Sequence, residues 1–473
     1  MPDFDAVVVG AGPNGLAAAV TLAGEGCSVL VVEAAPTIGG GARTAELTLP
    51  GFRHDVCSAV HPTGVASPFF RSLPLERHGL TWLQPEVPFA HPLDGGRAVW
   101  TTRSVDETAG RLGQDEAAYR RLVGRMVAQW GRLESFLLGP RLAIPAHPVA
   151  AARFGLVGGQ PATRVARALV TEEARALFAG CAAHAVLPLD RLTTASFGMI
   201  YPATAHAVGW PMAAGGSQAI VDALASVLAE RGGRVQTGVA VRSLHDLPTA
   251  KVVLFDVVPG ALADIAGARL PDGYVRRLRR FRHGPGAFKV DYALDGPVPW
   301  ANQELARAGT VHVGGTLEEV AEAERAVWRG DLPQRPFVIV AQPSVVDPSR
   351  APAGQQALWA YCHVPHGWPG DATDAIEGQI ERFAPGFRER VLARHTHGPA
   401  ELEAWNANYV GGDITGGAHT PRQLFFRPVP RLDPYSTPAR GIYLCSASTP
   451  PGAGVHGMCG HLAARSALRR GLG

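Results

Sequence analysis

The chain of 473 residues lacks several features that mark particular classes of protein. It holds no apolar run near about 18 residues, so no membrane-spanning helix is expected. Its six cysteines show no C-x-x-C spacing, which makes a metal site unexpected and favours reduced thiols in a cytoplasmic protein. The net charge is only +3, and the basic residues form no stripe, so nucleic acid is not an expected partner.

The amino terminus also leaves no room for a signal peptide, because the chain enters an apolar strand by Phe4. Hydrophobic residues make up 46% of the sequence and charged residues 18%, a composition typical of globular domains. The 56 glycines and 39 prolines imply many tight turns. At this length the chain is expected to form two or more domains.

The first motif occupies the first 33 residues. An apolar run at 5–9 leads into Gly10-Ala11-Gly12-Pro13-Asn14-Gly15, a small-residue helix follows, and a second apolar strand ends at Glu33. This order predicts a dinucleotide-binding βαβ unit, because the acid lies about 20 residues past the glycines. Gly10 permits the tight turn, Gly12 lets the backbone approach a pyrophosphate, and Gly15 lets helix and strand pack closely. Glu33 would accept hydrogen bonds from a ribose 2′-hydroxyl.

A second glycine cluster, Gly39-Gly40-Gly41-Ala42-Arg43-Thr44, follows shortly after Glu33, and NAD-binding units do not need it. Gly10 to Arg43 resembles the N-terminal FAD signature of the large family that contains amine oxidases, protoporphyrinogen oxidases and phytoene desaturases. Near the C-terminus, a strand at 441–446 precedes Thr449-Pro450-Pro451-Gly452-Ala453-Gly454-Val455-His456-Gly457 and a helix. This segment resembles the C-terminal FAD motif of phytoene desaturases. The sequence of residues 284–294 is similar to that of the phytoene-dehydrogenase-related branch, which is also labelled pyridine nucleotide-disulfide oxidoreductase domain protein 2-like.

The resemblance implies an α/β fold, in which a doubly wound Rossmann-type FAD-binding domain is interleaved with a substrate domain of antiparallel sheet and helical cap. Residues 1–75, 205–285 and 425–473 are expected to form the first domain, and 76–204 and 286–424 the second. Val241 matches a valine whose backbone contacts the adenine in the family. Many relatives have Gly-Asp where this chain has Ser446-Ala447, and that aspartate usually binds the ribityl or phosphate group. The resemblance therefore leaves the ribityl or phosphate contact to the backbone or to Ser446 and Ser448. FAD is expected to bind non-covalently to Gly10, Gly12, Pro13, Asn14, Gly15, Glu33, Ala34, Gly40, Gly41, Ala42, Arg43, Val241, Ser446, Ser448, Gly454, Val455, His456, Gly457 and Met458.

On the substrate side, the resemblance makes His61 a residue that lines the active site. His61 and His456 are the candidates for a proton acceptor, because an imidazole titrates near neutrality. Lys289 either orients a water beside the flavin, as a lysine does in some amine oxidases, or faces solvent from its strand. Tyr361 and His363 share one face of a predicted strand and are candidates for substrate contact.

The expected reaction removes hydride from a C–H or C–N bond of a mainly apolar small molecule. No second G-x-G-x-x-G follows the apolar strand at 250–256, so oxygen, a quinone or a carrier protein is the expected electron acceptor. Two alternatives stay open: a redox-neutral flavin-dependent isomerase or cyclase, and a non-catalytic FAD-binding interaction protein without room beside the flavin. Peripheral contact with a membrane is also left open, although no strongly basic amphipathic helix supports it.

Several elements between the motifs are predicted from periodicity. Apolar spacing predicts a helix over Asp115–Leu138, and Ser104 with Glu107 predicts a capping box at the start of a preceding helix. Strands are expected at 234–237 and 238–241, and a β-sheet is expected in the middle of the second half of the chain. A glycine-rich loop is expected at 411–419.

Overall fold

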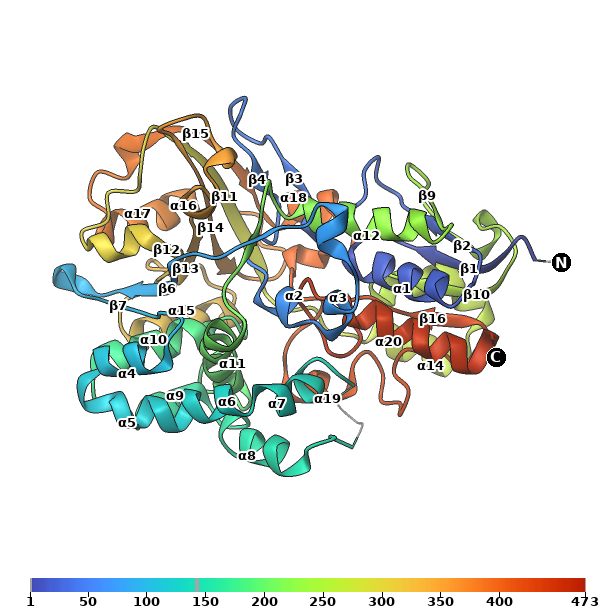
Figure 1. The fold of residues 1–473 in the computed structure, drawn as a ribbon, viewed down its shortest axis with the longest axis horizontal. Helices are drawn as coiled ribbons and strands as arrows, with labels where there is room; N and C mark the ends of the chain where they lie inside the picture. Colours follow the sequence, from blue (N-terminus) through green and yellow to red (C-terminus); the bar gives the residue numbers. More distant parts are fainter. Residues whose placement is uncertain (1, 141–143, 473) are drawn as a thin grey trace.

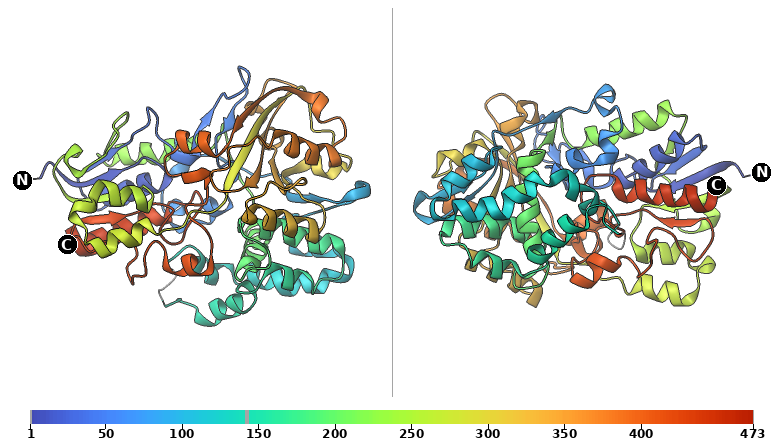
Figure 2. Two further views of the ribbon diagram at one scale, coloured as in Figure 1. Left: turned by 180° about the vertical axis from the view of Figure 1, so that it is seen from behind. Right: turned by 60° about the horizontal axis from the view of Figure 1, so that its bottom comes forward.

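The computed structural model describes residues 2–140 and 144–472. Two sheets lie at opposite ends of the molecule, and a group of helices lies beside the second sheet (Figures 1 and 2). Both termini are at the end formed by the first sheet.

The first sheet has five strands, and every neighbouring pair runs parallel. In spatial order they are β16 (Ile442–Leu444), β10 (Ala250–Phe255), β1 (Phe4–Val9), β2 (Val29–Val32) and β9 (Arg234–Gln236). The central strands are buried on both faces, which requires the near-continuous apolar runs seen in β1 and β2. One face packs against α1 (Pro13–Gly24), α12 (Gln218–Glu230) and α20 (Met458–Ala467), and the other against α13 (Pro259–Ala266) and α14 (Asp272–Arg279).

The second sheet has seven strands. In spatial order they are β15 (Val391–His397), β11 (Gly286–Leu294), β14 (Gln356–Val364), β13 (Val338–Ala341), β12 (Ala308–Val313), β6 (Val87–Pro92) and β7 (Ala98–Trp100). Its neighbours are antiparallel except β12 and β6, which run parallel. Helix α17 (Thr373–Phe383) packs on one face, and α15 (Leu317–Arg329) and the helical group pack on the other.

The sequence prediction omitted α15 and α17. Helix α15 nevertheless carries clear local signals, because Thr316 and Glu319 form a full capping box and Gly330 ends the helix in the left-handed conformation. At α4, Ser104 accepts the hydrogen bond from Glu107 N, which is the first half of the predicted box.

The helical group is more broken than predicted. It comprises α4 (Val105–Arg111), α5 (Glu116–Tyr119), α6 (Arg125–Ala128), α7 (Trp130–Leu137), α8 (Pro148–Gly158), α9 (Ala162–Ala166), α10 (Glu172–Ala183) and α11 (Thr194–Ala207). The single helix expected over Asp115–Leu138 is interrupted at Gln129, whose φ of −111° and ψ of 12° are not helical. Helix α11 was not predicted, because Pro202 lies inside it and proline usually marks a helix end.

The chain passes between the two halves repeatedly. Strands of the first sheet come from residues 4–32, 234–255 and 442–444, and those of the second from 87–100 and 286–397. This architecture confirms the predicted α/β fold class, and the stated domain boundaries stay a prediction. Across residues 2–140 and 144–472, no helix combines the length and apolar character needed to cross a bilayer.

Candidate cofactor and substrate site

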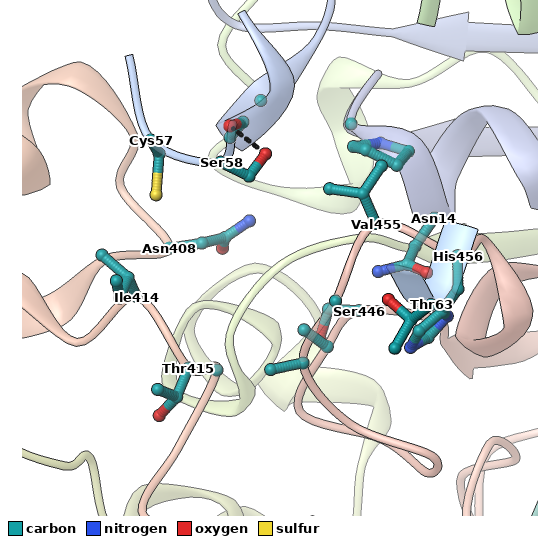
Figure 3. Close-up of a pocket in the computed structure, with 18 of the residues that line it drawn as sticks. Asn14, Cys57, Ser58, Thr63, Asn408, Ile414, Thr415, Ser446, Val455 and His456 are labelled. Atoms are coloured by element: carbon teal, nitrogen blue, oxygen red, sulfur yellow. Dashed lines mark hydrogen bonds between the residues drawn. The ribbon is translucent and has the colours of Figure 1, made fainter. Parts of the chain in front are cut away.

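A cavity of about 1150 Å³ lies between the two sheets and the helical group. Its lining begins at the loop between β1 and α1, includes the turn before α20, and extends to aromatic side chains beneath α11. Figure 3 shows Asn14, Ser446 and Val455 on one side and Cys57, Asn408 and Ile414 on the other. The cavity is therefore bounded by segments that are far apart in the sequence.

The loop after β1 has the geometry that its glycines predict. Gly10 has a φ of 103°, a conformation that favours glycine. A Cβ atom at Gly15 would lie 1.9 Å from the carbonyl oxygen of Gly10, so only glycine lets α1 approach β1 this closely. Gly12 is the N-cap of α1 and offers no capping side chain. Pro13 has no N–H and Gly15 N donates to Asp256, so Asn14 N is the first-turn N–H left for another partner. Gly10, Gly12, Pro13 and Asn14 all line the cavity.

Glu33 lines the same end of the cavity. Its Oε2 accepts a hydrogen bond of 2.7 Å from Ala11 N, and its Oε1 accepts one of 2.9 Å from Ala35 N. Arg43 lies 3.7 Å from Glu33 Oε1, but its guanidinium also donates to the carbonyl oxygens of Thr37 and Trp405. Both charged groups therefore hold the two glycine loops together as well as facing the cavity.

Asp256 was not singled out from the sequence. It follows β10 directly, lines the cavity, and accepts a hydrogen bond of 2.8 Å from Gly15 N with its Oδ2. Burial, with a smaller contribution from nearby Glu33, raises the pKa of Asp256 to about 7. The signal was present, because side chains at the carboxyl ends of neighbouring parallel strands meet at one edge of the sheet.

The segment after β9 differs from the prediction. β9 ends at Gln236, and residues 238–241 do not form a strand. Instead, Gly238 N donates to Ala35 O and Val239 N donates to Glu33 O, which fixes this turn beside β2. Val241 and its two preceding residues line the cavity next to Glu33.

The turn before α20 lines the cavity on the same side as Asn14 (Figure 3). Ser446, Ser448, Gly454, Val455 and His456 line the cavity. Ser448 Oγ is buried and has no hydrogen-bond partner in the structure, and the same holds for Asn14 Oδ1 of α1. Such atoms cost free energy unless a ligand or water satisfies them. His456 Nδ1 accepts a hydrogen bond of 3.0 Å from Met458 N.

Six predicted site residues do not line the cavity. They are Gly15, Ala42, Gly457, Met458, Lys289 and His363. The first four hold the loops that carry lining residues. Lys289 neither faces solvent nor reaches the cavity, because its buried ammonium forms an ion pair with Asp291 behind the wall. His363 shares a strand face with Tyr361, with ring centroids 5.6 Å apart, but its Nδ1 lies 2.7 Å from Glu324 Oε1 on α15.

The two remaining substrate-side predictions do lie at the cavity. His61 is buried and its Nε2 lies 2.8 Å from Ser217 Oγ. Burial lowers the pKa of His61 to about 4, so its imidazole is neutral at pH 7. Tyr361 is buried beside Trp359, with ring centroids 5.0 Å apart.

Sequence reasoning missed a histidine pair at the aromatic end of the cavity. His184, at the end of α10, lines the cavity beside Tyr201, and its Nε2 lies 2.9 Å from Nε2 of His312 on β12. Burial lowers the pKa of His184 to about 3 and lowers that of His312 well below its usual range. Neither residue belongs to a local motif, so only the folded structure brings them together.

Asp291, His395 and His397 form a further cluster, whose ligand atoms lie within 4.8 Å of one another. The register of β11 and β15 explains it, since Asp291 pairs with His395 and Lys289 with His397 on one sheet face. The Asp291 carboxylate is already engaged by the Lys289 ammonium, so a metal ion here would compete with that ion pair.

Known proteins match this chain at the levels of motif, whole sequence and fold. A family model described as an NAD(P)-binding Rossmann-like domain matches residues 8–73. Pyridine nucleotide-disulfide oxidoreductase domain-containing protein 2 of Mus musculus is 28% identical, covering 99% of this chain and 94% of the mouse protein. Phytoene dehydrogenase of Streptomyces griseus is 29% identical, covering 82% of this chain and 77% of that protein. A putrescine oxidase structure with bound putrescine has a TM-score of 0.63 at 19% identity, covering 98% of both chains.

These matches confirm the predicted resemblance and the predicted fold. The structural match concerns the fold alone, because its identity is low. The chain thus carries a dinucleotide-binding Rossmann-like segment and is similar to oxidoreductases over nearly its whole length.

Proposed function

We propose that this chain is an oxidoreductase that binds FAD non-covalently between the β1–α1 loop and the turn before α20. The observation that carries the proposal is the continuity of the cavity from these two loops to the aromatic pocket beneath α11. Its volume of about 1150 Å³ is above the roughly 300–1,000 Å³ typical of a site for one small ligand. It therefore offers room for a dinucleotide and a second molecule.

The chemistry of the lining fits the proposed cofactor. The uncapped start of α1 offers the Asn14 N–H to a pyrophosphate, and Glu33 offers carboxylate oxygens to a ribose. Asn14 Oδ1 and Ser448 Oγ are buried polar atoms that a ligand would satisfy. The need for two separate loops, one at each end of the chain, supports FAD over a nicotinamide dinucleotide.

Bound FAD would supply a hydride acceptor for the oxidation of a C–H or C–N bond. The chain's own contribution is to hold the substrate, exclude water and accept a proton. Gly457 is the N-cap of helix α20 and offers no capping side chain. The first turn of α20 therefore stabilises a negative charge on a ligand held beside the lining residues that precede it. His61, His456 and His184 all line the cavity, and the lowered pKa values of His61 and His184 make these two weak proton acceptors at pH 7.

Aromatic side chains support a mainly apolar substrate. Trp210, Tyr201, Trp359 and Tyr361 line the pocket, and Trp210 Nε1 donates to Thr310 Oγ1 at 2.8 Å, which leaves its ring face toward apolar neighbours. A flavin-binding protein without turnover would need no such pocket. The proposed electron acceptor is oxygen, a quinone or a carrier protein.

An absorbance spectrum of the purified protein tests the proposal. We expect flavin bands that bleach on photoreduction and return on mixing with air, within seconds for an oxidase and slowly for a dehydrogenase. Release of the flavin on acid precipitation would support non-covalent binding. A colourless protein that fails to take up added FAD would overturn the proposal.

The Gly12→Asp variant tests whether the pyrophosphate binds at the β1–α1 loop. A Cβ at Gly12 would lie 3.0 Å from Asp256 Oδ2, and a further carboxylate there would repel phosphate. We expect the variant to lose its yellow colour. Gly110→Asp is the matched control, because a Cβ at Gly110 meets no atom within 4 Å and the residue lies on α4. Retention of flavin by Gly12→Asp would contradict the proposed placement.

A further inference from the structure

Exposed apolar side chains gather where the cavity opens. Of the eleven exposed large apolar side chains in the described structure, six lie in two short stretches. They are Ile144, Val149 and Leu156 at α8, and Phe425, Phe426 and Leu432 at and after α19 (Pro421–Phe426). Scattered single apolar residues need no explanation on a protein surface, whereas a cluster indicates an interaction site.

Both stretches border the cavity. Phe425 is 44% exposed and also lines the cavity, and Gly155 of α8 is likewise exposed and lining. Phe154 and Leu424 line it from the same two helices. Figures 1 and 2 show α8 and α19 on the same side of the molecule, away from β15. The cavity therefore opens between two helices whose outer faces are apolar; these exposed side chains are called the mouth rim below.

The exposed face of α8 is a continuous stripe. Val149, Arg153 and Leu156 follow one another at spacings of four and three, so they share one side of the helix. Leu156 is 74% exposed and Val149 63% exposed, while Ala150 and Ala151 are buried. The helix thus packs inward through Ala150, Ala151, Phe154 and Val157, and it presents Val149 and Leu156 to the outside.

The two chain segments that carry the mouth rim are poor in acidic residues. No aspartate or glutamate occurs between Glu134 and Glu172, or between Asp413 and Asp433, although the chain has 41 acidic residues in total. Exposed basic residues do occur in both stretches. They are Arg153, Arg164, Arg167 and Arg422. Asp433, which directly follows Leu432, is paired with Arg470. Apolar side chains flanked mainly by cations complement the headgroups and acyl boundary of an anionic lipid surface.

We infer that the mouth rim on α8 and α19 docks on an anionic lipid surface, so that the cavity opens toward the bilayer. This deepens the proposed function, since an apolar substrate would then pass from lipid to the aromatic pocket without crossing water. The sequence prediction found no strongly basic amphipathic helix because the docking surface is split between two short helices, which only the fold brings together.

Vesicle flotation with the full-length, flavin-loaded protein tests the inference. We expect the protein to float with phosphatidylcholine vesicles that contain phosphatidylglycerol, and far less with phosphatidylcholine alone. The double variant Phe425→Ser/Phe426→Ser should lose at least about tenfold in vesicle affinity, because two large apolar anchors are removed. Arg153→Glu/Arg422→Glu should remove the preference for phosphatidylglycerol.

Matched controls lie far from the mouth rim. Leu392→Ser, on β15, removes a side chain that is 46% exposed, and Arg269→Glu reverses an exposed charge after α13. Both should bind vesicles as the unaltered protein does and keep their yellow colour, and every variant should keep its melting temperature. Equal losses in the controls and the rim variants would overturn the inference.

Two further outcomes would also overturn it. One is a protein that stays unbound with both kinds of vesicle. The other is a dimer in solution that Phe425→Ser/Phe426→Ser dissociates, since the occupant would then be a second copy of the chain. Vesicle binding by a protein that takes up no FAD would contradict the proposed function while leaving the docking surface intact, so the two failures are distinguishable.

Discussion

The two ends of the cavity are built in different ways. At the first sheet, backbone atoms and small residues dominate, as in the loop from Gly10 to Gly15 and the turn from Gly454 to Gly457. At the helical group, large side chains dominate, and they come from α7, α8, α11, β13 and β14, with His184 at the end of α10. The first end presents N–H groups and carboxylates, and the second presents aromatic rings and imidazoles that burial keeps neutral.

This difference suits one end of the cavity to binding a dinucleotide and the other end to binding a substrate. A dinucleotide has fixed phosphates and riboses, so its binding end is set by close backbone approach at a few glycines. The substrate end depends on how the register of β11, β14 and β15 and the packing of α10 place side chains from distant segments. Changes at the first end should therefore act through backbone geometry, and changes at the second through burial and protonation.

Gly15→Ala should give the largest effect. The added Cβ would lie 1.9 Å from Gly10 O, and neither α1 nor β1 can move without disturbing the parallel sheet. We expect a loss of about 3 kcal/mol or more in the free energy of unfolding, together with loss of bound flavin. Chemical denaturation followed by circular dichroism and flavin absorbance would measure both.

Gly378→Ala is the control for Gly15→Ala. Gly378 lies inside α17, where a Cβ meets no atom within 4 Å, so the helix should gain about 0.5–1 kcal/mol. Similar behaviour of the two variants would show that close packing at Gly15 does not set the nucleotide end.

His91→Gln should have the next largest effect and tests the substrate end. His91 is buried on β6, its Nε2 lies 2.7 Å from Gly315 O, and burial lowers its pKa to about 4. Since the unfolded chain binds the proton near pH 6.5, stability falls as the pH drops below 6.5, by about 2 kcal/mol at pH 5 from this residue. Glu319 and His312 are the titratable groups that face it.

Glutamine keeps a donor for Gly315 O but cannot take up the proton. The variant should therefore lose less stability than the unaltered protein between pH 7 and pH 5, whatever its stability at pH 7. Urea denaturation at both pH values measures this slope. Parallel slopes for the two proteins would contradict the low pKa of His91.

Asp256→Asn tests the nucleotide end through charge. Burial raises the pKa of Asp256 to about 7, so the carboxyl is protonated in acid and its ionisation opposes folding as the pH rises from about 4 to 7. An ionised Asp256 beside the start of α1 would also repel a pyrophosphate. FAD affinity should then weaken about tenfold, or about 1.4 kcal/mol, between pH 6 and pH 8.

Asparagine can still accept the hydrogen bond from Gly15 N, so the loop should keep its shape. We expect the affinity of Asp256→Asn to be nearly constant between pH 6 and pH 8, as measured by quenching of flavin fluorescence. An unchanged pH dependence in this variant would assign the titration to another group.

The sequence predicted the nucleotide end well because its signals are local. Gly10, Gly12, Glu33 and Gly454 each stand in a short pattern with a physical reason for its spacing, and all four line the cavity. The substrate end was harder to predict for two reasons. His184 and His312 meet only through tertiary packing. Lys289 and His363 share a sheet face with lining residues but do not line the cavity, and Asp291 and Glu324 pair with them. Alternation along a strand gives the face of a residue but not which partner will bind it.

Ser104→Ala should have the smallest effect of the four variants, and it tests whether the helical group is independent of the cavity end at the first sheet. Ser104 caps α4 by accepting a hydrogen bond of 3.2 Å from Glu107 N, a local signal within the helical group. Its loss should lower the free energy of unfolding by about 1 kcal/mol, because one N–H of the first turn loses its partner. The flavin spectrum should not change, since α4 does not line the cavity.

Ser135→Ala, at an exposed position within α7, is the control and should change the free energy of unfolding by less than about 0.5 kcal/mol. If Ser104→Ala altered flavin binding, the helical group and the nucleotide end would be coupled, and the separation between the two ends would be wrong.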